Sequence, residues 1–199
     1  MIMQRLKAET KPFHDQVEGK AFSKKIMDGS LSYAQYQELI FGNYLFHCVI
    51  EEALQNVLSE EEQLKLNLSK RLKKAVLEEE LTLMGFHLFD NSQLPEIKLN
   101  DFYEALGALY VMEGSTLGGA MIKKILMKNP TISQQAPLLF YGCYGEMIGK
   151  YWKDFVGVMN DLVQTLEQED KVVKKAIDAF NIFGTCLEVA KQGIGISAS

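Results

Sequence analysis

The positions of the prolines constrain this chain more than any other feature. The four prolines leave residues 13–94, 96–129 and 138–199 without any. Proline interrupts a helix because it has no backbone N–H and its ring clashes with the preceding turn. In these long stretches apolar residues recur at helical spacing, and convincing alternating strand patterns are missing. The sequence therefore predicts an all-α fold.

Capping residues set the expected start and end of the first long helices. Ser32 is followed three residues later by Gln35, a capping box that opens a helix running to about Gln55. A charged amphipathic helix is expected over residues 69–84, where Gly85 stops it. Each of these helices presents an apolar stripe that must be buried against another element.

A second group of helices is expected in the rest of the chain. Asn100 or Asp101 caps a long helix that runs to about Lys128, where Asn129 and Pro130 end it. At the N-terminus, Pro12 predicts a kink or a helix that restarts near Thr10. Two further helices are expected over residues 146–166 and 169–191.

Length and composition are those of an ordinary globular chain. It has 199 residues, of which 47% are hydrophobic and 24% charged. This length buries one sizeable core, and we find neither an internal repeat nor a linker. We therefore expect a single domain over residues 1–199, with the small and polar residues 193–199 as a frayed tail.

The charge balance argues against binding to nucleic acid, and the lengths of the apolar runs argue against a membrane span. The 21 basic and 26 acidic residues give a net charge of −5, and only Arg5 and Arg71 are arginines. No apolar run approaches the roughly 20 residues of a membrane span. The N-terminus lacks the apolar region of a signal peptide, and the odd set Cys48, Cys143 and Cys186 forms no disulfide framework. We expect a cytoplasmic protein with no nucleic-acid or membrane partner.

His14 is the histidine with the most informative neighbours. Glu18 follows one helical turn later on the same face, the spacing of a histidine that binds a metal through one ring nitrogen while a carboxylate holds the other N–H. Lys7 and Lys11 stand on the same segment and could neutralise an acidic ligand. The alternative is an ordinary helix histidine with solvated lysines nearby.

Other metal-site patterns are weak. The chain has no Glu-x-x-His motif, although a di-iron site could be assembled from scattered carboxylates such as Glu51 and Glu52. We interpret His47 as a packed or partly exposed helix residue and assign no role to His87.

Residues 105–125 are the most anomalous stretch. They are apolar on most helix faces but contain Gly107, Gly114, Gly118 and Gly119. Each glycine costs about 1 kcal/mol relative to alanine inside a helix, so its presence needs a reason. One reason is close helix–helix packing, and the other is a flat ligand pressed against the helix backbone.

Three segments in this order resemble the heme oxygenase family, in particular its compact bacterial members. They are LKAETKPFH at residues 6–14, LYVMEGSTLGG at residues 109–119, and FYGCYG at residues 140–145 followed by Trp152 and Phe155. The resemblance extends over nearly the whole chain. It implies a helical bundle in which heme b lies between a proximal helix and a distal helix that is kinked by glycines.

The resemblance also implies a reaction and a set of site residues. The heme would be both cofactor and substrate, cleaved with O₂ to biliverdin, carbon monoxide and ferrous iron, with electrons from a separate reductase or ferredoxin. His14 would be the axial iron ligand, partnered by Glu18. The remaining implied residues are Lys7, Lys11 and Tyr110 at the cofactor and Gly114, Ser115, Gly118 and Gly119 at the distal face. Two alternatives stay open: a heme-binding protein without turnover, and a di-iron or thiaminase-like enzyme on the same fold.

Two departures from the family pattern bear on details of the site. Ser115 stands where vertebrate members carry Asp, so distal water would be anchored differently. Where several members offer basic residues from the last helix to the heme propionates, this chain has Ile177 and Asn181. Lys171, Lys174 and Lys175 come about a turn earlier, and we expect the propionates to depend more on Lys7, Lys11 and Tyr110.

Overall fold

The structure, a computed structural model, describes residues 1–86 and 94–192, so the predictions for His87 and for residues 193–199 fall outside it. Most of the described residues are helical, and no strand occurs among them. The all-α prediction is confirmed. The longer helices are α1 (Ile2–Lys20), α3 (Tyr33–Val57), α5 (Lys74–Leu83), α6 (Phe102–Leu117), α9 (Ile148–Leu162) and α10 (Leu166–Lys191). The shorter elements are α2 (Ser23–Met27), α4 (Glu60–Lys65), η1 (Leu68–Lys70), α7 (Gly119–Leu126), α8 (Pro130–Ser133), η2 (Phe140–Gly142) and η3 (Gly145–Met147).

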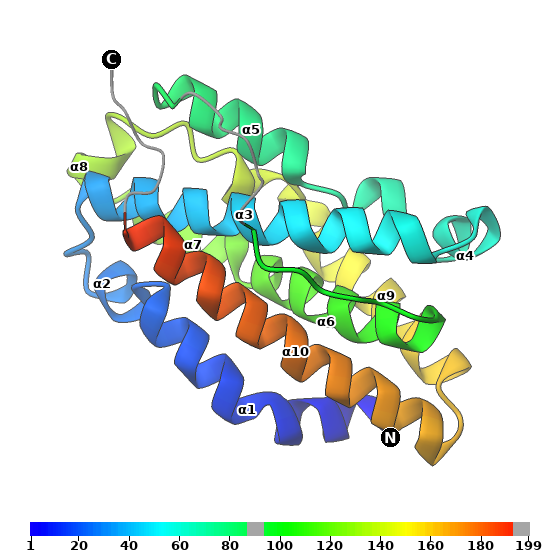
Figure 1. Ribbon diagram of the computed structural model, residues 1–199. Coiled ribbons are helices and arrows are strands. Elements are labelled where there is room, and N and C mark those ends of the chain that lie inside the picture. The colour runs from blue at the N-terminus through cyan, green and yellow to red at the C-terminus, as the bar shows by residue number, and fades with distance from the viewer. Residues whose placement is uncertain (87–93, 193–199) are drawn as a thin grey trace.

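Helix α10 is the centre of the packing. It contacts α6, α3 and α1 (Figure 1). In Figure 1, α1 and α10 run side by side in the same direction, while α3 runs the opposite way. The face of α10 toward these helices buries apolar residues, among them Val172, Ala176, Phe183 and Leu187. This burial against three neighbours holds the bundle together.

Side-chain caps define where the long helices begin. The Ser32 hydroxyl accepts a hydrogen bond from the Gln35 amide, and the Gln35 side chain returns one to the Ser32 amide, so the predicted capping box is confirmed. The Asp101 carboxylate likewise accepts from the Glu104 amide at the start of α6. A third cap, from Thr165, opens α10 at Leu166, which is three residues earlier than the sequence predicted.

The predicted helix over residues 69–84 is wrong at its start. The chain first makes the short turn η1, and α5 begins only at Lys74. The reason lies in the connection between η1 and α5, because the side chains of Arg71 and Lys73 turn inward and the two residues are each 1% exposed. The predicted end is confirmed, since Gly85 follows α5 with a φ of +83°, a conformation that favours glycine.

The predicted continuous helix from residue 101 to about Lys128 is divided in two. Helix α6 ends at Leu117, Gly118 stands between the two helices, and α7 begins at Gly119 and ends at Leu126. The expected helix over residues 146–166 is also shorter, because η3 comes first and α9 covers only Ile148–Leu162. The division at Gly118 agrees with the glycine-kinked distal helix that the family resemblance implied.

Helix α1 continues through Pro12, so no second helix starts at Thr10. Figure 1 shows α1 changing direction partway along its length. The Thr10 hydroxyl donates to the Leu6 carbonyl at 2.7 Å and so supports the turn before the proline.

A search of the described helices for one that is both long and apolar enough to cross a membrane finds none.

Candidate functional site

A cavity of about 690 Å³ lies between α1 and α6, with further walls from α3, α9 and α10. That volume falls within the range of about 300 to 1,000 Å³ that is typical of small-molecule and cofactor sites. Most of its wall is apolar or aromatic: Val17, Ile26, Leu39, Val111, Leu117, Ile122, Tyr141, Trp152, Phe180 and Phe183. The polar residues gather mainly on α1, so the cavity has one polar side.

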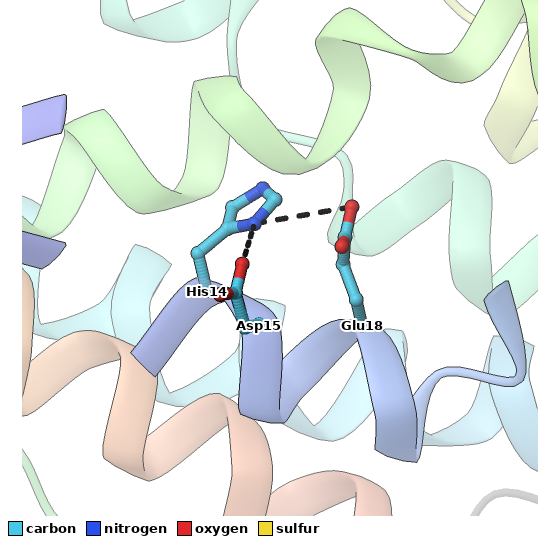
Figure 2. A group of neighbouring side chains, drawn as sticks. All are labelled: His14, Asp15 and Glu18. Atoms are coloured by element: carbon cyan, nitrogen blue, oxygen red, sulfur yellow. Dashed lines mark ion pairs between the residues drawn. The ribbon is translucent and has the colours of Figure 1, made fainter. Parts of the chain in front are cut away.

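His14 projects from α1 at the edge of this cavity. Its side chain is 54% exposed, and its ring meets the Phe180 ring edge-on with 5.9 Å between centroids. Nδ1 lies 3.8 Å from the Glu18 carboxylate and 3.9 Å from that of Asp15. Figure 2 shows the ring pointing away from α1 toward the green ribbon of the α6–α7 segment. Nδ1 therefore faces carboxylates, and Nε2 is left for a ligand in the cavity.

The carboxylates around His14 include one that the sequence reasoning missed. In the part of the chain that the structure describes, His14, Asp15 and Glu18 form the one group of side chains close enough to share a metal ion. Asp15 is already paired with Lys11 at 2.6 Å. The predicted His14–Glu18 spacing does bring the two side chains together, but the 3.8 Å separation is longer than a hydrogen bond.

Glu51 and Glu52 do not form a carboxylate metal centre among the described residues. The Glu51 carboxylate accepts from the backbone amides of Lys73 and Lys74 at 2.6 and 2.9 Å, and His47 Nδ1 lies 2.8 Å from the same oxygen. Glu51 is thus an internal hydrogen-bond acceptor that joins α3 to the start of α5.

The wall opposite His14 is formed by the end of α6. Gly114, Ser115 and Gly118 all line the cavity. A Cβ atom added at Gly114 would meet nothing within 4 Å, and one at Gly118 would come only within 3.7 Å of Ile122. The missing side chains therefore leave space in the cavity. The Ser115 hydroxyl donates to the Met112 carbonyl of its own helix at 2.8 Å. This hydrogen bond uses the hydroxyl proton, so Ser115 cannot donate that proton to a water molecule at the same time.

The other two glycines of this stretch serve packing. Gly119 does not line the cavity, and a Cβ there would lie 3.2 Å from the Tyr141 carbonyl oxygen. A Cβ at Gly107 would collide with the Val172 carbonyl oxygen and lie 2.9 Å from the Ala176 amide of α10. Close packing therefore explains Gly107 and Gly119, whereas Gly114 and Gly118 border the open space of the cavity.

The cations and the tyrosine expected at the cofactor also line the cavity. Lys7 and Lys11 lie on α1, and no ion pair of Lys7 is found within residues 1–86 and 94–192. Tyr110 packs against Trp152 with 6.0 Å between ring centroids. Burial raises the pKa of Tyr110, against the effect of a hydrogen bond with Thr10, so its hydroxyl keeps its proton at neutral pH.

The last helix supplies aromatic rings to the cavity in place of cations. Phe180 and Phe183 line it, whereas Ile177 and Asn181 do not. Lys171 is paired with Asp101 at 2.8 Å, and Lys175 is buried with its ammonium 3.0 Å from the Lys98 carbonyl. Lys174 is exposed and lies outside the cavity wall.

Two features of the site had no signal in the sequence. Asn43 of α3 lines the cavity although it is only 3% exposed, and its amide nitrogen donates to the Leu39 carbonyl at 2.8 Å. On the side of α6 away from the cavity, Arg71, Lys73 and Glu113 form a buried ionic group. Single charged residues spaced 40 positions apart have no periodicity that would have indicated such a contact.

Comparison with known proteins gives a consistent result. A model of the heme oxygenase family matches residues 1–189. Heme oxygenase PigA of Pseudomonas aeruginosa is 29% identical over 186 residues, which cover 93% of this chain and 90% of that protein.

Two solved structures share the fold. The NO- and CO-bound heme oxygenase of Neisseria meningitidis superposes with a TM-score of 0.72 at 24% identity, covering 100% of this chain and 94% of that one. Heme oxygenase-1 of the cyanobacterium Synechocystis in complex with heme gives a TM-score of 0.71 at 18% identity, covering 98% and 96%. With a family match over almost its entire length, this chain belongs to the heme oxygenase family.

Proposed function

We propose that this protein binds heme in the cavity between α1 and α6, with His14 as the axial iron ligand, and cleaves it to biliverdin, carbon monoxide and ferrous iron. The observation that carries the proposal is the arrangement of His14 opposite Gly114 and Gly118, with an apolar space between them. Electrons would come from a separate reductase or ferredoxin.

The residues present fit heme. The aromatic and aliphatic walls match the apolar faces of a porphyrin, and the polar side on α1 can receive its two carboxylates. Among the described residues no protein partner of the His14 Nε2 is found, and iron is a common partner of neutral imidazole. When bound, the heme supplies the iron that activates O₂ and is itself the molecule oxidised.

On the proximal side, Glu18 would hold the His14 Nδ1 proton. The 3.8 Å between these atoms closes to a hydrogen bond with a small side-chain rotation, because both groups are exposed. Such a bond fixes the tautomer that leaves Nε2 free, and it increases the basicity of the ligand. Glu18 is therefore a positioning residue for His14.

On the distal side, Gly114 and Gly118 carry no side chains, so the α6 backbone can approach the reacting face of the ligand closely. Ser115 is given a supporting role, because its hydroxyl already donates to the Met112 carbonyl and retains only its acceptor capacity for a water molecule. Water held by backbone groups would then deliver the proton.

Lys7, Lys11 and Tyr110 are the proposed partners of the propionates. Lys11 would exchange its exposed ion pair with Asp15 for a propionate at little cost, because exposed pairs contribute only about 0 to 1 kcal/mol. The Tyr110 hydroxyl would add a neutral donor from the other wall by exchanging its hydrogen bond with Thr10 for one with a propionate.

Titration of the purified protein with hemin tests the proposal. The wild type should give a one-to-one complex with the visible spectrum of histidine-ligated ferric heme. His14→Ala should lose that spectrum, and added imidazole should restore it by filling the space of the lost ring. His47→Gln is the matched control, because it removes a histidine that does not line the cavity and should leave the spectrum unchanged. An unchanged spectrum in His14→Ala would show that another residue ligates the iron.

A further inference from the structure

Four side chains behind the distal helix form one hydrogen-bonded group, here called the Glu113 cluster: Arg71, Lys73, Glu113 and Tyr144. Arg71 and Lys73 are each 1% exposed and Glu113 is 2% exposed. The three partners converge on one carboxylate. Arg71 donates to Glu113 Oε2 at 2.5 Å, the Tyr144 hydroxyl donates to Oε1 at 2.6 Å, and the Lys73 ammonium lies 3.2 Å from Oε1.

The buried charges of the cluster depend on one another. Burial lowers the pKa of Lys73, and the charge of Glu113 opposes this effect. Lys73 is further held by the Arg71 carbonyl at 2.7 Å and by the Tyr144 hydroxyl at 2.8 Å. Loss of the Glu113 charge would leave two cations buried beside each other, so the cluster holds its geometry only when complete.

None of the four side chains lines the cavity, yet the cluster ties together segments that do. Glu113 directly precedes Gly114 on α6. Both terminal nitrogens of Arg71 donate to the Tyr151 carbonyl at 3.3 Å, and Tyr151 directly precedes Trp152 on α9.

Tyr144 extends the same connection to a third wall segment. It lies three residues after Tyr141, which lines the cavity from η2. Its ring also packs against the Tyr151 ring, with 4.6 Å between centroids. Because protein interiors are close-packed, a shift at the cluster is transmitted to the neighbouring wall residues.

We propose that Glu113 is a positioning residue, and that the Glu113 cluster sets the separation between the glycine face of α6 and the Trp152 wall of α9. The cluster thereby fixes the shape of the cavity above its ligand. The inference rests on the proposed function only where it identifies that ligand as heme.

Two variants of the full chain test this role. Tyr144→Phe keeps the ring and removes one donor to Glu113, so it is the milder change. Glu113→Gln keeps the shape of the side chain and removes the negative charge of the carboxylate. The matched control is Asn129→Ala, which deletes buried hydrogen bonds to the Gly29 and Leu31 carbonyls at a position outside the cavity wall.

The first readout needs no heme. Trp152 is the only tryptophan of the chain, so its fluorescence reports on this wall in the heme-free protein. Both cluster variants should shift the Trp152 emission to longer wavelength and raise acrylamide quenching by about twofold, because a loosened wall admits water and quencher. Asn129→Ala should lower the melting temperature and leave the Trp152 emission unchanged.

The second readout uses the ferric heme complex. The visible spectrum of this complex is recorded as a function of pH, and the pH of half-maximal change is its midpoint. This midpoint depends on the groups that surround the iron, so it should move by about 0.5 pH unit or more in the cluster variants.

The outcomes separate this inference from the proposed function. If the cluster variants melt at a lower temperature but keep the wild-type Trp152 emission, quenching and pH midpoint, the cluster serves stability alone and the inference is overturned. If Glu113→Gln does not fold, Tyr144→Phe decides the matter. If the wild type binds no heme, the proposed function fails, while the Trp152 readout still decides whether the cluster positions the wall.

Discussion

At the residue scale, His47 shows how burial changes a titratable group. Nδ1 lies 2.8 Å from the Glu51 carboxylate, and Nε2 has no hydrogen-bond partner in the part of the chain that the structure describes. The ring is enclosed by the aromatic rings of Phe46 and Phe140. Burial lowers the pKa of His47 against the opposing effect of Glu51, so the folded protein keeps this imidazole neutral.

A lowered histidine pKa makes stability depend on pH. In the unfolded chain His47 takes up a proton near its ordinary pKa of about 6.5, while in the folded chain it does so only at lower pH. The contribution of this residue is therefore fully present above about pH 6.5 and decreases as the pH falls, by at most about 1.4 kcal/mol per pH unit.

We expect the free energy of unfolding of the wild type to fall more steeply than that of His47→Gln between about pH 7 and pH 5. Urea unfolding at several pH values measures both slopes. The difference between the two slopes reports on His47 together with its contact to Glu51. Parallel slopes would show that His47 titrates normally in the folded state.

At the element scale, the α6–α7 segment combines two uses of glycine. Gly114 and Gly118 leave space in the cavity, whereas Gly107 and Gly119 permit close packing on α10 and η2. Substitutions at the two kinds of position should therefore have opposite effects on stability and on heme binding.

Gly114→Leu should abolish heme binding while leaving the melting temperature equal or higher. A Cβ atom there meets no neighbouring atom within 4 Å, and leucine is favoured over glycine in a helix by up to about 1 kcal/mol. Gly118→Leu should behave similarly in heme binding.

Gly107→Ala is the matched comparison on the same helix. It should lower stability by about 1 to 3 kcal/mol, because the added methyl group collides with the α10 backbone, and the folded fraction should bind heme normally. Hemin titration and thermal melting measure both properties. Normal heme binding by Gly114→Leu would show that the ligand does not lie against this face.

An element boundary could be predicted from the sequence where the interactions that set it join residues only a few positions apart. The caps at Ser32 and Asp101 and the turn at Gly85 act over three or four residues, so these boundaries were predictable, whereas the equally local cap at Thr165 was missed. The start of α5 was not, because the inward turn of Arg71 depends on Glu113, 42 residues away. The residues of α1 and α6 that line the cavity were found through motifs, whereas Asn43 has no motif that marks it.

At the scale of the whole molecule, the cavity lies between elements from both ends of the chain. Helix α1 and helix α10 pack side by side and carry His14 and Phe180, and α6 forms the opposite wall. Heme that binds only this folded arrangement should stabilise it, by about 2.7 kcal/mol when its free concentration is 100 times the dissociation constant. Thermal melting with and without hemin measures this effect, and an unchanged melting temperature would contradict the assignment of the cavity.

Turnover of the hemin complex is the most direct test of the central claim. With a reductant and O₂ at neutral pH, the wild type should lose its heme absorption and form biliverdin and carbon monoxide, detected by their absorption spectra. His14→Ala should form little biliverdin under the same conditions and recover activity with imidazole. A heme complex that is reduced and exposed to O₂ without forming biliverdin would instead make this a heme-binding protein that does not degrade its ligand.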